Sequence, residues 1–209
     1  MRHIIGTGRR AMYIGIFNNI GCMTSPELQD IERQIHGVNE EARDLVRRLS
    51  GTQFNWRAAP GQWSIAQCLE HLAVTAQLEL PHLERAISQA IQRQQFATGP
   101  FRYGRLGSWF VRSLEPPVKF KVKTTKPFAP PSADRRVDEV LGSYLQAHEE
   151  VLDLRRSDGL DLARVRVTSA FVRYIHFSLG HAFAMIPAHA RRHLWQARQV
   201  QGNAEFPVG

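Results

Sequence analysis

Apolar residues recur at alternating steps of three and four in four long stretches of this 209-residue chain. That spacing places one apolar stripe along one side of an α-helix, and each stripe has to be covered by other apolar surface. The stripes occupy residues 28–49, 65–91, 137–152 and 179–197. Four amphipathic helices of this length predict an all-α fold, a four-helix bundle.

Capping and breaking residues mark the ends of these helices. A Thr-x-x-Glu capping box from Thr24 predicts the start of the first helix, and Gly51 is expected to end it. A second box from Ser64 predicts that the second helix begins directly after that serine. The third and fourth helices are predicted over 133–156 and 178–199. Prolines inside the second and fourth patterns are expected to kink both helices.

Residues 95–132 are broken by glycine and proline, which predicts a long crossover between the second and third helices. Within the crossover, residues 105–114 can form a short helix. Residues 118–123 alternate apolar and basic side chains at the period of a strand, so we expect an extended segment with its lysines in water. Residues 160–177 are ambiguous and expected to be partly extended.

The chain length suits one domain, which we predict over residues 23–200, followed by a short tail over 201–209. Residues 1–22 faintly resemble a secretory signal, with arginines before a mildly apolar segment. Asn18 and Asn19 interrupt that segment. The sequence therefore favours a poorly ordered extension, with the folded part beginning at Met23.

The composition gives weaker indications. Lysine and arginine number 27 against 19 acidic residues, and a net charge of +8 invites a nucleic-acid or anionic-membrane interpretation. The arginines are scattered over helix surfaces, however, and few aromatic residues interleave with the lysines, which does not favour nucleic-acid binding. Two cysteines cannot build a disulfide framework, so the cytoplasm is the expected compartment. No apolar run approaches the ~20 residues of a membrane span.

Three of the nine histidines share a pattern that can bind a metal. His189 and His193 stand four residues apart on the fourth helix, so their rings lie on one face and can share a cation at ~2.0–2.1 Å. A solvated or structural pair would show the same spacing. A third ligand must come from another helix, and His71 borders the stripe of the second helix.

The surrounding residues resemble a known family. Residues 60–65 (Pro-Gly-Gln-Trp-Ser-Ile) followed by His71, and the H-x-x-x-H-x-x-Q run from His189 to Gln196, resemble the two signatures of the DinB-like superfamily. The resemblance covers the predicted domain and implies a four-helix bundle that binds a divalent metal through His71, His189 and His193. Characterised members use low-molecular-weight thiols as cosubstrates of transferases and isomerases, and many relatives have no established reaction.

Such a ligand set suits Lewis-acid chemistry. Three neutral imidazoles leave the charge of a dication uncancelled and a coordination position open, so that bound water or a thiol ionises readily. Zinc is the expected ion, and nickel, iron or manganese also suit histidine-rich sites.

Two further residues are weaker candidates for the catalytic machinery. Gln196 lies three residues beyond His193 and can orient a ligand, although a surface amide is the alternative. His148 falls on the apolar face of the third helix, where it can serve as an acid–base group or as a hydrogen-bonded core residue. The remaining candidates are expected to pack, to face solvent or to lie too far away: Trp63, Cys68, Glu70, His82, His181 and Trp195.

The predicted function is metal-dependent thiol transfer to a small electrophilic substrate, with metal-assisted hydrolysis close behind. The sequence singles out no general base. The alternative is a non-catalytic, metal-stabilised bundle that acts by homodimerisation or partner binding.

Overall fold

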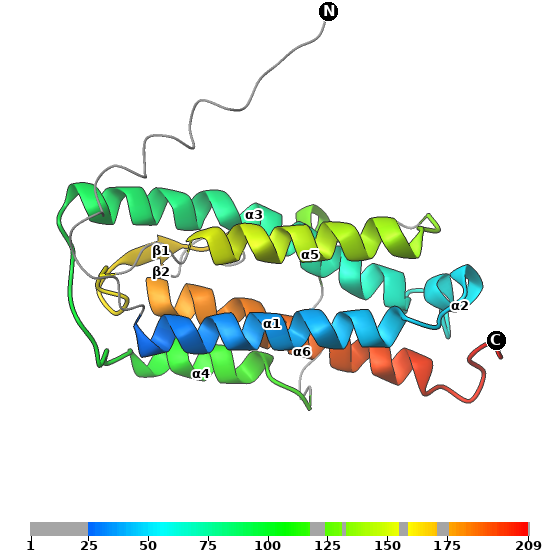
Figure 1. The fold of residues 1–209 in the computed structure, drawn as a ribbon. Coiled ribbons are helices and arrows are strands. Elements are labelled where there is room, and N and C mark those ends of the chain that lie inside the picture. The colour runs from blue at the N-terminus through cyan, green and yellow to red at the C-terminus, as the bar shows by residue number, and fades with distance from the viewer. Residues whose placement is uncertain (1–24, 118–123, 131–132, 155–158, 171–175, 209) are drawn as a thin grey trace, which may run out of the picture.

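The computed structural model describes residues 25–117, 124–130, 133–154, 159–170 and 176–208. Its four long helices are α1 (Pro26–Val46), α3 (Ile65–Gln92), α5 (Val137–Asp153) and α6 (Leu179–Gln201). Helices α1 and α3 each pack against both α5 and α6, which confirms the all-α four-helix bundle (Figure 1). The predicted extension over residues 1–22 and the predicted extended segment over 118–123 lie outside the described residues.

Serine side chains cap the starts of α1 and α3, although the cap of α1 is Ser25 and the predicted cap residue, Thr24, lies outside the described residues. Ser25 caps α1 by accepting from the backbone N–H of Leu28. The predicted box at the start of α3 is confirmed: Ser64 Oγ accepts from the N–H of Gln67, whose side-chain oxygen accepts from the N–H of Ser64. Helices α3 and α6 continue through Pro81 and Pro187.

The predicted end of the first helix is wrong. Helix α1 ends at Val46, and Gly51 begins a further short helix, α2 (Gly51–Asn55). The reason is a capping box that the sequence reading missed, in which Ser50 and Gln53 exchange backbone and side-chain hydrogen bonds.

The crossover contains the expected helix α4 (Arg105–Leu114) and a short 3-10 helix, η2 (Lys126–Phe128). It carries the chain back along the bundle, so that α3 and α5 run parallel while α3 and α6 run antiparallel (Figure 1). Helix α4 packs against α6, and η2 lies against α3. The crossover therefore covers the side of the bundle where α3 meets α6.

A small antiparallel sheet precedes α6, as expected for a partly extended region. Strand β1 (Arg166–Thr168) pairs with β2 (His176–Ser178), and Val167 lies opposite Phe177. Both of these side chains point into the core. The sheet closes the end of the bundle where α6 begins (Figure 1).

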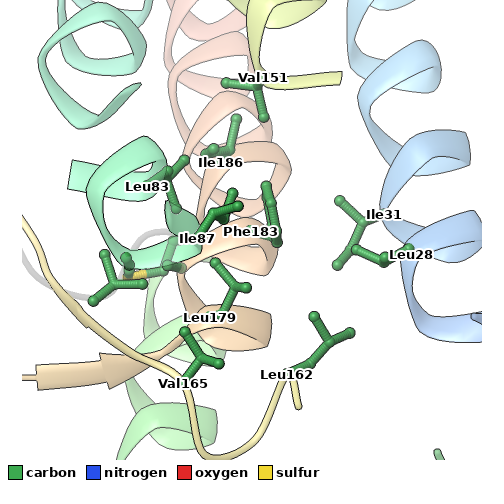
Figure 2. Close-up of a cluster of buried hydrophobic side chains, with 14 of the residues drawn as sticks. Leu28, Ile31, Leu83, Ile87, Val151, Leu162, Val165, Leu179, Phe183 and Ile186 are labelled. Carbon is green, nitrogen blue, oxygen red and sulfur yellow. The ribbon is translucent and has the colours of Figure 1, made fainter. Parts of the chain in front are cut away.

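The apolar core is divided into two clusters along the bundle. One cluster, shown in part in Figure 2, lies at the sheet end and includes Leu28, Leu83, Phe183 and Ile186. The other lies at the α2 end and includes Phe54, Leu69, Tyr144 and Leu194. Polar residues fall between the two clusters on all four long helices, namely the buried Asn39, Thr75 and His148 and the partly buried His189.

Within the described part of the chain, no helix combines the length and hydropathy that crossing a bilayer requires.

Ser64→Ala is expected to lower the free energy of unfolding by about 1 to 2 kcal/mol, because the buried N–H of Gln67 loses its acceptor. Urea denaturation followed by circular dichroism measures the change. Ser143→Ala, on the exposed face of α5, is the control and should stay within ~0.5 kcal/mol of wild type. Equal losses in the two variants would contradict the capping role.

Candidate metal centre

The structure brings the three predicted histidines together between α3 and α6. Nε2 of His189 lies 3.3 Å from Nε2 of His71 and 3.0 Å from Nε2 of His193. The candidate ligand atoms of the three rings all lie within 4.8 Å of one another. His71 and His193 are buried and His189 is partly buried, so one imidazole from α3 meets two from α6 inside the bundle.

Two oxygen atoms fix the orientation of two of these rings, those of His71 and His193. Nδ1 of His71 lies 2.6 Å from the carbonyl oxygen of Phe128 in η2, and a carbonyl can only accept, so this nitrogen carries the proton. Nδ1 of His193 lies 3.0 Å from Oε1 of Gln196, which accepts a hydrogen bond from the protonated Nδ1 in the same way. Each ring is thereby left with an Nε2 lone pair that points at the shared centre.

The spacing of the nitrogens fits a shared cation. Two metal–nitrogen bonds of ~2.0–2.1 Å that meet at an angle between square and tetrahedral separate their nitrogens by roughly 2.8–3.4 Å. The two Nε2 separations of 3.0 and 3.3 Å fall in this range. A cation between these nitrogens would accept the lone pairs of His71 and His193, so the spacing and chemistry of the donor set fit a metal ion.

Burial keeps the three rings neutral, which metal ligation requires. It lowers the pKa of His71, against a smaller opposing effect of the hydrogen bond to Phe128. Burial, followed by the neighbouring His71 and Arg192, lowers the pKa of His193 to about 3. The pKa of His189 falls well below its usual value, first through burial and then through the two other rings.

Trp63 packs directly on the triad. Its ring stacks on His193 with centroids 5.6 Å apart and planes inclined by 25°, and it lies 4.9 Å from the ring of His71. The indole therefore limits the movement of two of the candidate ligands and shields them from water.

An open cleft of about 1200 Å³ extends from the triad in both directions along α3 and α6. The arm toward the sheet end has apolar walls from three helices, which we call the apolar arm: Leu72, Ala76, Phe110, Leu114, Met185 and Ile186. The arm toward the C-terminal end of α6 is rich in amides, which we call the amide arm: Gln62, Gln196, Gln199 and Asn203. Among the described lining residues, Arg192 and Glu79 carry the formal charges.

His148 also lines this cleft. It is 1% exposed, and its Nδ1 lies 2.6 Å from Oδ1 of Asn39 on α1. Burial lowers the pKa of His148 to about 4, so the ring is neutral near pH 7. When Nδ1 donates to Asn39, Nε2 keeps a lone pair.

The remaining candidate residues lie outside the triad, and Glu70 differs from its predicted position. The expectation that Glu70 faces solvent is wrong: it is buried, with Oε1 3.1 Å from Nε of Arg135. The segment that leads into α5 covers this face of α3, which periodicity within α3 does not reveal. Cys68 is a free, fully buried cysteine whose pKa is raised by burial. His181 lies away from the triad and bonds Ser178 and Ser108.

The sequence reading missed three contributors to the site. Asn39 and Glu79 are polar residues that the folded chain buries, and Phe128 contributes a backbone carbonyl. A polar residue beside an apolar stripe, such as Asn39 beside Val38, was an available signal. A carbonyl in a crossover gives no signal in the sequence.

The family model of the DinB superfamily matches residues 34–197, so this chain belongs to the DinB superfamily. The match covers most of the chain and includes all three histidines. Neither the comparison with curated proteins nor the comparison with solved structures gave a match.

His148→Gln is expected to flatten the pH dependence of stability in the metal-free protein. The unfolded ring titrates near pH ~6.5 and the folded ring about pH 4, so the unfolded chain takes up the proton first as the pH falls. Stability from this group is present above pH ~6.5, and about 2 kcal/mol of it is lost between pH 7.5 and 5. Urea denaturation of chelator-treated wild type and variant at both pH values measures the difference. Equal losses would contradict the assignment.

Proposed function

We propose that this chain is a metal-dependent enzyme that transfers a low-molecular-weight thiol to a small electrophilic substrate, with His71, His189 and His193 as metal ligands. The observation that carries the proposal is the convergence of three Nε2 atoms, with the rings of His71 and His193 held by Phe128 and Gln196. Membership of the DinB superfamily supports it. Zinc is the proposed ion, with nickel, iron or manganese as alternatives.

When bound, the cation would supply a Lewis acid that lowers the pKa of a thiol or a water molecule. The residues of the chain have separate roles around it. Gln196 holds the ring of His193, and Trp63 shields the ligands on one side. Arg192 lines the cleft beside the triad and favours an anionic group there.

The two arms of the cleft allow two molecules to meet at the triad. The amide arm offers hydrogen-bond donors and acceptors to a polar thiol, and the apolar arm suits the body of an electrophile. His148 is a proposed proton acceptor, because its ring is neutral and lines the cleft. The proposed compartment is the cytoplasm, which the free Cys68 supports.

Zinc-repleted wild type is expected to retain about one equivalent of metal, whereas His71→Ala and His193→Ala each lose most of it because two imidazoles bind too weakly. Elemental analysis after gel filtration measures the content. His36→Ala, on the exposed face of α1, is the matched control and should retain the metal. Equally little metal in wild type and triad variants would overturn the proposal.

Turnover tests the reaction itself. Glutathione, cysteine and dithiothreitol are each mixed with a chromogenic aryl halide and the zinc-loaded protein. We expect turnover that chelation removes and zinc restores, and that His193→Ala lacks. A protein that binds zinc stoichiometrically without such turnover would instead be a metal-stabilised bundle, and sedimentation would then test its homodimerisation.

Gln196→Ala is expected to weaken zinc affinity about 10- to 100-fold, because the ring of His193 loses the acceptor that orients it. Competition with a chromogenic chelator measures the affinity. Gln199→Ala is the control, since Gln199 lines the same arm one turn further along α6, and it should change the affinity less than about threefold. Unchanged affinity in Gln196→Ala would remove the orienting role.

A further inference from the structure

Glu79 is a buried carboxyl group in the wall of the apolar arm. It is 1% exposed. Its Oε2 accepts from Ser169 Oγ at 3.1 Å and from the backbone N–H of Ala170 at 2.9 Å. Its Oε1 is buried and has no hydrogen-bond partner among the described residues. Oε2 is therefore held by two hydrogen bonds, whereas Oε1 has no hydrogen-bond donor among the described residues.

An unmatched buried carboxylate oxygen is costly, and such groups in proteins are normally paired with a donor or a cation. Two hydrogen bonds to Oε2 favour the ionised form, while burial raises the pKa of Glu79 against those bonds and against the nearby His82. A ligand that brings a positive donor to Oε1 would satisfy the group, because charge-assisted hydrogen bonds are the strongest of their kind.

The position of Glu79 relative to the triad defines the shape of such a ligand. Glu79 follows His71 by two turns of α3, which is ~12 Å along the helix axis. The walls in between are mainly apolar, with the hydroxyl of Thr75 donating to the carbonyl oxygen of Leu72, and the apolar side chains come from α3, α4 and α6: Leu72, Ala76, Phe110, Leu114, Met185 and Ile186. Apart from Arg192 and Glu79, the described lining residues carry no formal charge. An apolar chain with a cation at one end matches this arrangement.

We propose that the apolar arm binds a linear, apolar primary amine, with the ammonium group on Oε1 of Glu79 and the opposite end of the molecule at the histidine triad. This inference deepens the proposed function, on which it rests for the triad end, since it names the substrate class of one arm. Glu79 acts as a specificity-determining residue.

Three probes of equal chain length test the Glu79 end without any metal. Octylamine, 1-octanol and octanoate are titrated into metal-free protein at pH 7.5 by calorimetry. We expect octylamine to bind at least about 10-fold more tightly than the other two. Equal affinities, or tighter binding of octanoate, would overturn the proposal, and this ranking in wild type requires no variant.

Variants then assign the preference to Glu79. Glu79→Gln is expected to bind octylamine and 1-octanol within about threefold of each other, because the amide lacks the charge. Glu84→Gln, on the exposed face of α3, is the matched control and should keep the wild-type ranking. A preference for octylamine that survives Glu79→Gln would assign it elsewhere and overturn the proposal.

A bifunctional probe separates this inference from the proposed function. Octane-1-thiol and 8-amino-1-octanethiol are added to cobalt-loaded protein, and sulfur-to-cobalt charge-transfer absorption reports thiol binding. We expect at least about 10-fold tighter binding of the aminothiol. Octylamine preference without any such absorption would leave the Glu79 site standing and count against the metal function. Absorption without an advantage for the aminothiol would count against the Glu79 inference alone.

Discussion

Three imidazole rings meet inside a helical bundle, and much of the structure serves to hold them together. Nε2 of His189 lies 3.3 and 3.0 Å from Nε2 of His71 and His193, whose lone pairs point at the same centre, and a cation there would accept those lone pairs. The bundle accommodates them in a polar layer between two apolar clusters, to which each long helix contributes. Hydrogen bonds within this layer, such as the one between Asn39 and His148, reduce the free-energy cost of burying its polar side chains. The triad is therefore a largely buried group of three histidines that could hold a metal ion.

The long crossover determines what surrounds that charge. By returning along the bundle it makes α3 and α5 parallel (Figure 1), and it places α4 and the segment around η2 against the cleft. Helix α4 supplies Phe110 and Leu114 to the apolar arm, and η2 supplies the carbonyl of Phe128 to His71. Arg135, just before α5, pairs with Glu70. A bundle with short loops would keep the helices and lose these contacts.

The charges of the cleft differ from those of the whole chain. The net charge of +8 first pointed to an anionic macromolecule. In the cleft, however, Arg192 lies beside the triad and Glu79 at a distance along α3, with apolar and amide side chains between and beyond them. This arrangement supports the proposed small-molecule substrate, because a few fixed charges in a partly buried cleft act more selectively than a charge spread over the surface.

Local chemistry determined the parts of this protein that the sequence predicted. The Ser64 cap, the helical stripes and the spacing of His189 and His193 depend on residues within a few positions of one another, so they could be predicted from the sequence alone. Periodicity gives the face of a helix on which a residue lies but not the element that covers it. For that reason only the tertiary structure decided that the carbonyl of Phe128 holds the ring of His71 and that Arg135 pairs with a buried Glu70. It also decided that Ser169 bonds Oε2 of Glu79 while Oε1 has no partner among the described residues. Each of these contacts joins segments far apart in the chain, and chain folding rather than local propensity creates them.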